Sequence, residues 1–214
     1  MTKTETSKSI DYRYYHWGPL LYHVSLPTDQ LENLKKLCVR TIKKDDRKGL
    51  AGHLGEEYYI DEKKFFHITW EYFLSYIKAY KTHLSLEVGN TVEIINAWVN
   101  FMKASECNPP HAHQGDISCI IYTHIPPEIK KEWESNISTS GGAGSVEFFG
   151  FPSLDKRMYR TLHNFFPEEG DFFIFPASLW HYVTPFKTSG IERISISANL
   201  KIPIEKEKEN NENK

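Results

Sequence analysis

Two histidines separated by one residue are the first feature of this sequence that could do chemistry. His111 and His113 stand in the segment 108–116, which reads NPPHAHQGD. In an extended strand, side chains two residues apart share one face, so both imidazoles can point at the same spot. Imidazole and carboxylate groups bind Fe(II), Mn(II), Ni(II) and Zn(II), and Asp116 follows at a turn marked by Gly115. The spacing predicts a metal site; the alternative is a pair of exposed loop histidines.

A third histidine, His181, stands 68 residues after His113. It follows the apolar run 171–175 and a turn at Pro176, and it neighbours Trp180. Taken alone, such a histidine is typical of an interior or rim position. Two ligands from one strand and a third from a distant strand are the layout of a metal site inside a β-barrel, so the pairing with the upstream histidines favours a ligand.

An arginine in an otherwise apolar strand is the next candidate. Arg193 and Ser195 alternate onto one face of the segment 192–199, ERISISAN. An inward arginine needs an anionic partner, and its planar guanidinium binds carboxylates through two parallel hydrogen bonds. The alternative is a structural ion pair with an Asp or Glu. Tyr122, nine residues after His113, could bring its hydroxyl to the same carboxylate, although a strand tyrosine is usually a core residue.

The elements that must position these residues are a succession of strands preceded by helices. Helical spacing of apolar residues predicts one helix from an N-cap at Thr28 to about Ile42, and a second over 61–84 with Trp70 in its buried stripe. Apolar runs bounded by Gly and Pro predict strands at 92–102, 117–125, 145–150, 171–175, 180–184 and 193–202. This order predicts an α+β fold with helices packed on one face of an antiparallel barrel or sandwich.

The chain is expected to form one domain over residues 11–204, with helical support at 28–84 and a barrel at 90–202. Residues 1–10 are expected to be flexible, and the charged tail 205–214 to be disordered. The stretch 127–145 is read as a loop, and its length and composition predict that it borders the substrate entrance.

Composition narrows the class of protein. The 214 residues carry a formal charge of −2, which indicates no general affinity for nucleic acid or anionic membranes. No run reaches the ~18 apolar residues of a membrane-spanning helix, and the N-terminus lacks the apolar stretch of a signal peptide. The three cysteines, Cys38, Cys107 and Cys119, have no CxxC spacing and are read as reduced thiols. A cytoplasmic protein is predicted.

Taken together, these motifs resemble the 2-oxoglutarate/Fe(II)-dependent oxygenase superfamily, and most closely the prolyl-hydroxylase-like members found in phage and bacterial genomes. The resemblance covers residues 92–202 and rests on WVN (98–100), HxHxGDxS (111–118), IIY (120–122), FPxxxxHxVxP (175–185) and ERISISANL (192–200). It implies a double-stranded β-helix, that is, a jelly-roll or cupin-like barrel. It also implies Fe(II) and 2-oxoglutarate as cofactors, O₂ as co-substrate, and hydroxylation of an unknown protein or small molecule. A virus-encoded enzyme acting in the host cytoplasm fits the same resemblance.

The ligand motif departs from the superfamily pattern of His-x-Asp followed by a distant His. In one interpretation His111 and His113 bind together and a histidine replaces the aspartate. In the other, His113 is the first ligand and Gly115 stands in place of the aspartate, as in the similar aspartyl/asparaginyl β-hydroxylases, which use two histidines. His113 and His181 are the predicted ligands in both, while His111 and Asp116 compete for the third position.

The resemblance also assigns the cosubstrate. It implies that 2-oxoglutarate chelates the metal through its 1-carboxylate and 2-keto oxygens, while its 5-carboxylate meets Arg193 with help from Ser195 and Tyr122. Trp98 and Asn100 share a strand face by alternation and are predicted to line the pocket, although a core role is equally compatible with the sequence.

Two rival functions remain open at this point. A cupin without 2-oxoglutarate would use HxH followed by an acid, and Gly170…Pro176…His181 fits its second motif except for Ser178 in place of a glycine. Arg193 and Ser195 favour the oxygenase, since a cupin has no need for them. A structural or binding protein with incidental histidines is the third interpretation.

Overall fold

The computed structural model of the chain describes residues 10–16, 19–43, 54–84, 88–136, 141–149 and 162–203. The predicted flexible segment 1–10, apart from Ile10, and the predicted tail 205–214 lie outside the described residues. None of the helices in these ranges has the length and apolar character required to cross a membrane. The three cysteines are free thiols, as predicted.

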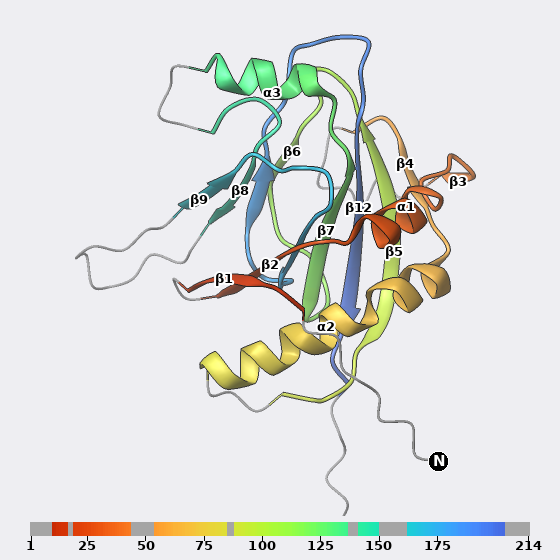
Figure 1. Cartoon of the computed structure of the whole chain (residues 1–214), viewed down its shortest axis with the longest axis vertical. Helices are drawn as coiled ribbons and strands as arrows, with labels where there is room; N and C mark the ends of the chain where they lie inside the picture. Colours follow the sequence, from red (N-terminus) through yellow and green to blue (C-terminus); the bar gives the residue numbers. More distant parts are fainter. Residues whose placement is uncertain are drawn as a thin grey trace, which may run out of the picture.

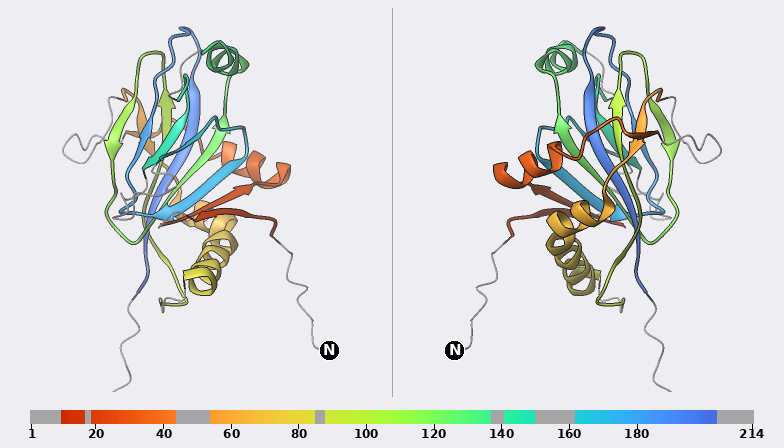
Figure 2. Two further views of the ribbon diagram at one scale, coloured as in Figure 1. Left: turned by 90° about the vertical axis from the view of Figure 1, so that its left-hand side faces the viewer. Right: turned by 90° about the vertical axis from the view of Figure 1, so that its right-hand side faces the viewer.

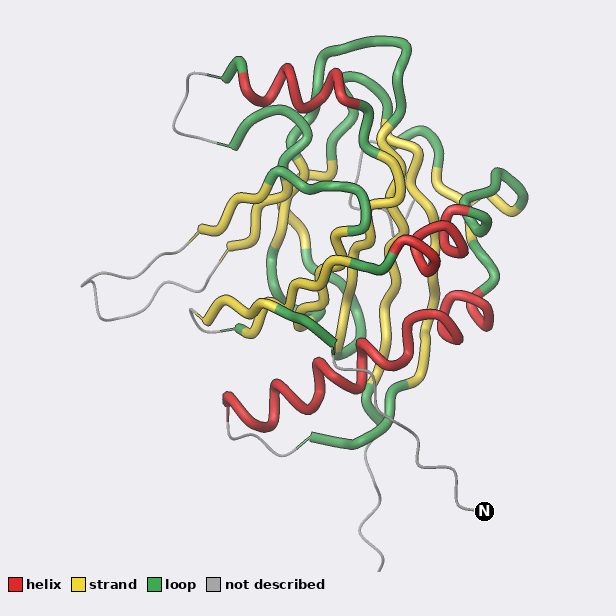
Figure 3. Tube along the Cα trace, viewed as in Figure 1, coloured by secondary structure: helices red, strands yellow, loops and turns green. Residues whose placement is uncertain are grey.

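Two antiparallel sheets form the body of the protein (Figures 1 and 3). The major sheet has the strand order β1-β2-β10-β7-β12-β5-β4-β3. Its strands are β1 (Arg13–His16), β2 (Leu20–Ser25), β3 (Ile42–Lys43), β4 (Glu57–Tyr59), β5 (Glu93–Met102), β7 (Ile117–His124), β10 (Asp171–Pro176) and β12 (Arg193–Lys201). The minor sheet has the order β6-β11-β8-β9, with β6 (Asn108–His111), β8 (Val146–Phe149), β9 (Leu162–Phe165) and β11 (His181–Val183).

Helices cover one face of the major sheet and one end of the barrel. Helices α1 (Thr28–Lys35) and α2 (Glu62–Leu84) lie on the side of the major sheet away from the minor sheet (Figure 2). Helix α3 (Pro127–Glu134) lies at the opposite end of the molecule from α2 (Figure 1). The predicted α+β barrel with helices on one face is therefore confirmed.

Strand alternation divides the major sheet into an apolar outer face and a partly polar inner face. In β5, Ala97, Val99 and Phe101 belong to the core beneath the helices, together with Phe73 and Ile77 of α2. The intervening residues of β5 face the space between the sheets, where Met102 joins a second core. The same alternation in β12 turns Arg193, Ser195, Ser197 and Asn199 inward, and all four are buried.

The first helix is shorter than its apolar spacing predicts. It ends at Lys35, and Ile42 lies in β3 instead of the helix. Thr28 is the first helical residue and Pro27 occupies the N-cap position without a side-chain hydrogen bond, so the predicted cap is wrong. The second helix spans almost the predicted range, but Trp70 is 41% exposed because the helix turns Phe73 and its neighbours toward the sheet instead.

The stretch read as a loop at 127–145 contains helix α3. Pro127 stands at the start of this helix, where the missing amide proton of proline costs nothing, and Ile129 is its buried anchor. The strand expected to hold both His111 and His113 is β6, which contains Pro109 and Pro110 and ends at His111, and the half-exposed β9 was not predicted. These strands form by pairing with β11 and β8, an interaction that local apolar patterning does not reveal.

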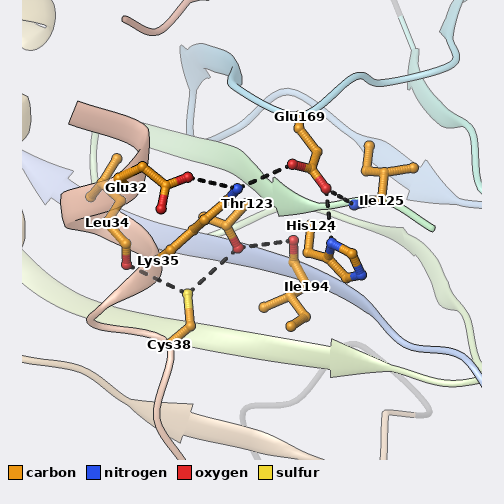
Figure 4. Close-up of polar contacts among 9 residues, drawn as sticks. All are labelled: Glu32, Leu34, Lys35, Cys38, Thr123, His124, Ile125, Glu169 and Ile194. Atoms are coloured by element: carbon orange, nitrogen blue, oxygen red, sulfur yellow. Dashed lines mark hydrogen bonds and ion pairs between the residues drawn. The ribbon is translucent and has the colours of Figure 1, made fainter. Parts of the chain in front are cut away.

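One carboxylate links α1, the end of β7 and the approach to β10 (Figure 4). Glu169 accepts hydrogen bonds from the Ile125 amide (3.0 Å), from His124 Nδ1 (2.8 Å) and from Lys35 Nζ (3.2 Å). Partial burial alone would raise the pKa of Glu169, but the Ile125, His124 and Lys35 contacts outweigh it and lower the pKa below its usual value. The ionised carboxylate thus stabilises this junction of the fold.

We predict that Glu169→Gln lowers the free energy of unfolding by about 1 kcal/mol at neutral pH, because the hydrogen bonds from the Ile125 amide and from His124 and the partly exposed ion pair with Lys35 are weakened. A carboxyl with a depressed folded pKa stabilises the fold above its unfolded pKa, near 4.3, and this stabilisation is lost as pH falls through the lower folded value. Urea denaturation at neutral pH and near pH 3 should show the difference shrinking with acid. Exposed Glu168→Gln is the control, and equal effects of both variants would contradict the assignment.

Candidate active site

Three imidazoles from distant parts of the chain converge between the two sheets. The possible ligand atoms of His111, His113 and His181 all lie within 4.8 Å of one another. The Nε2 atoms of His113 and His181 are 3.2 Å apart. Two nitrogen ligands about 2.1 Å from a metal and at right angles to each other are separated by about 3 Å, so this pair has the spacing of adjacent ligands.

Backbone pairing holds the imidazoles in place. His111 of β6 is the register partner of His181 of β11. The His113 amide donates to the carbonyl of Ala177 at 2.8 Å, which ties the segment after β6 to the turn after β10. Nδ1 of His181 lies 3.0 Å from the Leu179 carbonyl, and Nδ1 of His111 lies 2.7 Å from the Pro109 carbonyl. A proton donated from Nδ1 leaves Nε2 as the ligand atom in both rings.

His181 is electrostatically prepared to remain neutral. Its side chain is buried beside Phe148 and Phe175. Burial lowers the pKa of His181 well below its usual value, the proximity of His111 and His113 lowers it further, and only the hydrogen bond to the backbone of Leu179 opposes the shift. A neutral imidazole keeps the lone pair that a metal requires.

His111 and Asp116, the two candidates for the third ligand position, lie on opposite sides of the turn that follows His113. Asp116 lies outside the imidazole cluster: its Oδ2 accepts the amide of Ile202 at 2.6 Å, and its own amide donates to Leu200. Gly115 adopts a φ of 96°, and a Cβ there would lie 2.7 Å from the Leu200 carbonyl oxygen. The turn therefore requires glycine at 115 for steric reasons, and His111 is the residue that the fold brings to the other two.

A second polar centre surrounds the inward-facing guanidinium of β12. Arg193 is 3% exposed and donates to the Gly144 carbonyl and to Met102 Sδ, both at 2.9 Å. Its Nε is buried without a hydrogen-bond partner, and within the described residues no carboxylate forms an ion pair with it. The predicted alternative of a structural ion pair is thus not seen there. A buried cation without a counter-ion is expected to bind an anionic ligand.

Polar residues of neighbouring strands extend this centre toward the imidazoles. Tyr122, Ser195 and Asn100 are register neighbours across β7, β12 and β5. The Tyr122 hydroxyl is buried without a partner, and the Arg193 guanidinium carbon lies 5.4 Å from its ring. Burial raises the pKa of Tyr122 to about 12, against a lowering effect of Arg193, so the hydroxyl keeps its proton at neutral pH. Trp98 Nε1 donates to Asn100 Oδ1 at 3.0 Å, and the Trp98 ring lies 6.0 Å from His113.

Helix α3 closes the barrel beside Arg193. Ile129 of this helix belongs to the interior core, and a Cβ on Gly144, which has a φ of 71°, would lie 2.5 Å from Ile129. Ser145, which follows Gly144, has a buried hydroxyl without a hydrogen-bond partner. Gly144 and Ser145 were not predicted to contribute to this centre, because small residues in a GGAGS stretch indicate only a loop.

One open hollow of the described structure lies away from the imidazoles and Arg193. It has a volume of about 630 Å³ and is lined by Tyr76 and Tyr80 of α2 together with Asp116 and Ile202. None of the three clustered histidines lines it. The chemistry of this protein is therefore assigned from the polar centres between the sheets and not from the size of a surface hollow.

The chemistry of the two centres fits one pair of cofactors. Three imidazole nitrogens suit a divalent transition metal. A buried guanidinium and a buried tyrosine hydroxyl, whose Nε and Oη have no partner among the described residues, suit an organic carboxylate. Both centres face the same interior, because their residues alternate onto the inner face of adjoining strands or pair across the minor sheet.

Comparisons with known proteins agree with this reading. Residues 96–199 match the sequence profile of a family described as "Putative 2OG-Fe(II) oxygenase". A comparison with curated protein sequences gives no significant match.

Solved structures show the same fold at low sequence identity. HygX from Streptomyces hygroscopicus, with nickel, 2-oxoglutarate and hygromycin B bound, has a TM-score of 0.54 and 12% identity over 86% of this chain and 83% of its own. A prolyl-4-hydroxylase from Pseudomonas putida has a TM-score of 0.50 and 16% identity, over 86% and 93%. The viral collagen prolyl hydroxylase of Paramecium bursaria Chlorella virus-1, in complex with 2-oxoglutarate, has a TM-score of 0.50 and 13% identity, over 86% and 96%. The double-stranded β-helix predicted from the sequence is thereby confirmed. The sequence match places residues 96–199 of this chain in the 2-oxoglutarate/Fe(II)-dependent oxygenase superfamily, and the solved structures share the fold that carries this stretch.

Proposed function

We propose that this chain is a hydroxylase whose Fe(II) is held by His111, His113 and His181 and whose 2-oxoglutarate is anchored by Arg193. Fe(II) and 2-oxoglutarate are the cofactors of its superfamily, with O₂ as co-substrate. When bound, they supply oxidative decarboxylation of 2-oxoglutarate to succinate and CO₂, coupled to insertion of one oxygen atom into a substrate C–H bond. The prime substrate is a protein or small molecule, and we propose that the enzyme acts in the cytoplasm.

The residues of the chain bind and orient the metal and 2-oxoglutarate, and they exclude water from the site. Three protein ligands leave coordination positions for the 2-keto acid and for O₂. The Arg193 guanidinium and the protonated Tyr122 hydroxyl fix the far carboxylate, while Ser195 and Asn100 support the strands on which they stand. Trp98, Phe148 and Phe175 form apolar walls around the imidazoles, so that the reacting centre is kept dry.

The observation that carries the proposal is the buried Arg193 guanidinium without a carboxylate partner in the described structure. A metal-binding cupin explains the three histidines equally well but gives no reason for this cation. A structural protein explains neither the cation nor the convergence of three imidazoles. Release of succinate from 2-oxoglutarate, dependent on Fe(II), is the reaction that separates the oxygenase from both.

We predict that removing an imidazole removes the metal. His181→Ala and His111→Ala should each weaken binding of Fe(II), or of Zn(II) as an inert probe, by about 100-fold or more, since loss of a supporting contact alone typically costs 10- to 100-fold. Calorimetric titration of the metal-free protein measures this. Asp116→Asn is the matched control and should bind the metal like the wild type. Normal affinity in His111→Ala combined with weak binding in Asp116→Asn would show that the aspartate is the third ligand.

We predict that Arg193→Met weakens 2-oxoglutarate binding by about 30-fold or more, because a buried charge pair is worth roughly 2–5 kcal/mol. Tyr122→Phe, which removes only a hydroxyl, should weaken it about 3- to 10-fold. Without 2-oxoglutarate, Arg193→Met should not lower the melting temperature, because the substitution removes an unpaired buried charge. Thermal unfolding with and without 2-oxoglutarate measures both effects. A large loss of stability in the ligand-free variant would instead assign the arginine a structural role.

A further inference from the structure

A row of three polar side chains crosses the inner face of the major sheet on the far side of the imidazoles from Arg193. Asn96 of β5 pairs with Asn199 of β12, which pairs with Ser118 of β7. We call these three residues the amide row. Asn199 lies four residues beyond Ser195 on β12, or about 13 Å along the strand. A 2-oxoglutarate molecule anchored at Arg193, with roughly 6 Å between its carboxylates, therefore does not reach the amide row.

The amide row is next to the imidazole cluster. Phe175 of β10 is the register partner of Ser118, and its ring lies 4.9 Å from that of His181. Trp98 stands on the same face of β5 as Asn96, two residues along, and its ring lies 6.0 Å from that of His113. The barrel interior is thus ordered from the closed end at Arg193, past the metal ligands, to the amide row.

The amide row contains an unused hydrogen-bond acceptor. Oδ1 of Asn96 is buried and has no hydrogen-bond partner in the part of the chain that the structure describes. The Ser118 hydroxyl donates to Asn199 Oδ1 at 3.0 Å and is close to the Ala198 carbonyl at 3.4 Å. The other two side chains of the row, Ser118 and Asn199, are therefore hydrogen-bonded to each other. A buried acceptor left without a donor costs about 1–3 kcal/mol, which a ligand with an N–H or O–H group would recover.

The inner-face row next to the amide row on the Arg193 side is uncharged, and on the other side Lys201 and Glu93 form an ion pair with each other at 2.9 Å. The inner-face residues of the adjacent register row are Trp98, Ser197 and Ile120. No acid or base stands among these six positions to neutralise a charged ligand. A charged group placed here would lose its hydration without a counter-charge, so the site discriminates in favour of neutral polar groups.

We propose that the amide row binds the prime substrate, and that Asn96 recognises an uncharged N–H or O–H donor of the substrate next to the carbon that reacts. This inference rests on the proposed function, because it takes the imidazole cluster as the reacting centre. It assigns to this chain a substrate that is neutral and polar at the reacting end, such as a peptide amide or a sugar hydroxyl.

Two matched pairs of probes test this proposal on the full chain loaded with Zn(II) and 2-oxoglutarate. One pair is N-acetylproline N-methylamide and its N,N-dimethylamide; the other is methyl glucoside and its fully O-methylated form. Saturation-transfer NMR titration gives the affinities. In at least one pair, the member with a free donor should bind about 5- to 10-fold more tightly, the value of one hydrogen bond. The pair that discriminates identifies an amide or a hydroxyl as the donor.

Substitution of the acceptor should abolish the discrimination. In Asn96→Leu, which replaces the amide by an apolar group of similar shape, the affinity ratio should fall toward one, with 2-oxoglutarate affinity unchanged. Asn33→Ala, on the exposed face of α1, is the control and should keep the wild-type ratio. Equal affinities within both pairs in the wild type, absence of binding included, would overturn the proposal, as would an unchanged ratio in Asn96→Leu. Failure of the proposed function itself would appear separately, as an absence of Fe(II)-dependent succinate release without any probe.

Discussion

Among the described residues, a positive charge buried without a negative partner constrains the interior of this protein. The Arg193 side chain is removed from water and contacts one carbonyl oxygen, one thioether sulfur and the face of the Tyr122 ring. None of these contacts neutralises a guanidinium, so the fold alone holds the charge at a cost. That cost is recovered when an anion of the right size enters. Helix α3, which closes this end of the barrel, and the buried Tyr122 hydroxyl both lie beside this charge.

The two sheets contribute different parts of the site. The long strands of the major sheet offer a continuous inner face on which polar residues occur at regular intervals, from Arg193 at one end to Asn199 at the other. The short strands of the minor sheet bring His111 and His181 together as register partners. If the three imidazoles hold the metal as proposed, they add no charge, and the two negative charges of 2-oxoglutarate would be balanced by the metal and the guanidinium. A site built this way depends on both sheets keeping their register.

The sequence predicted the parts of the fold that carry strong periodic patterns. The long strands β5, β7 and β12, the helix α2, and the inward position of Arg193 follow from alternation or helical spacing in single segments. The bounds of β6 could not be predicted, because Pro109 and Pro110 argue against a strand and only pairing with β11 overrides them. The choice between His111 and Asp116 could not be made either, since it depends on how the turn at Gly115 aims the chain. The unpaired atoms of Ser145 and Asn96 become visible only when neighbouring strands are placed together.

We propose that the barrel interior binds a metal at the imidazoles and a dicarboxylate between that metal and the Arg193 guanidinium. If both ligands share this space, each must raise the affinity for the other by the same factor. Calorimetric titration of 2-oxoglutarate into the chain with and without Zn(II), together with the reverse titration, measures both factors. The account predicts that they are equal and that Zn(II) tightens 2-oxoglutarate binding by about 10-fold or more, the scale of a strong coupling between sites. The same 2-oxoglutarate affinity with and without Zn(II) would contradict it.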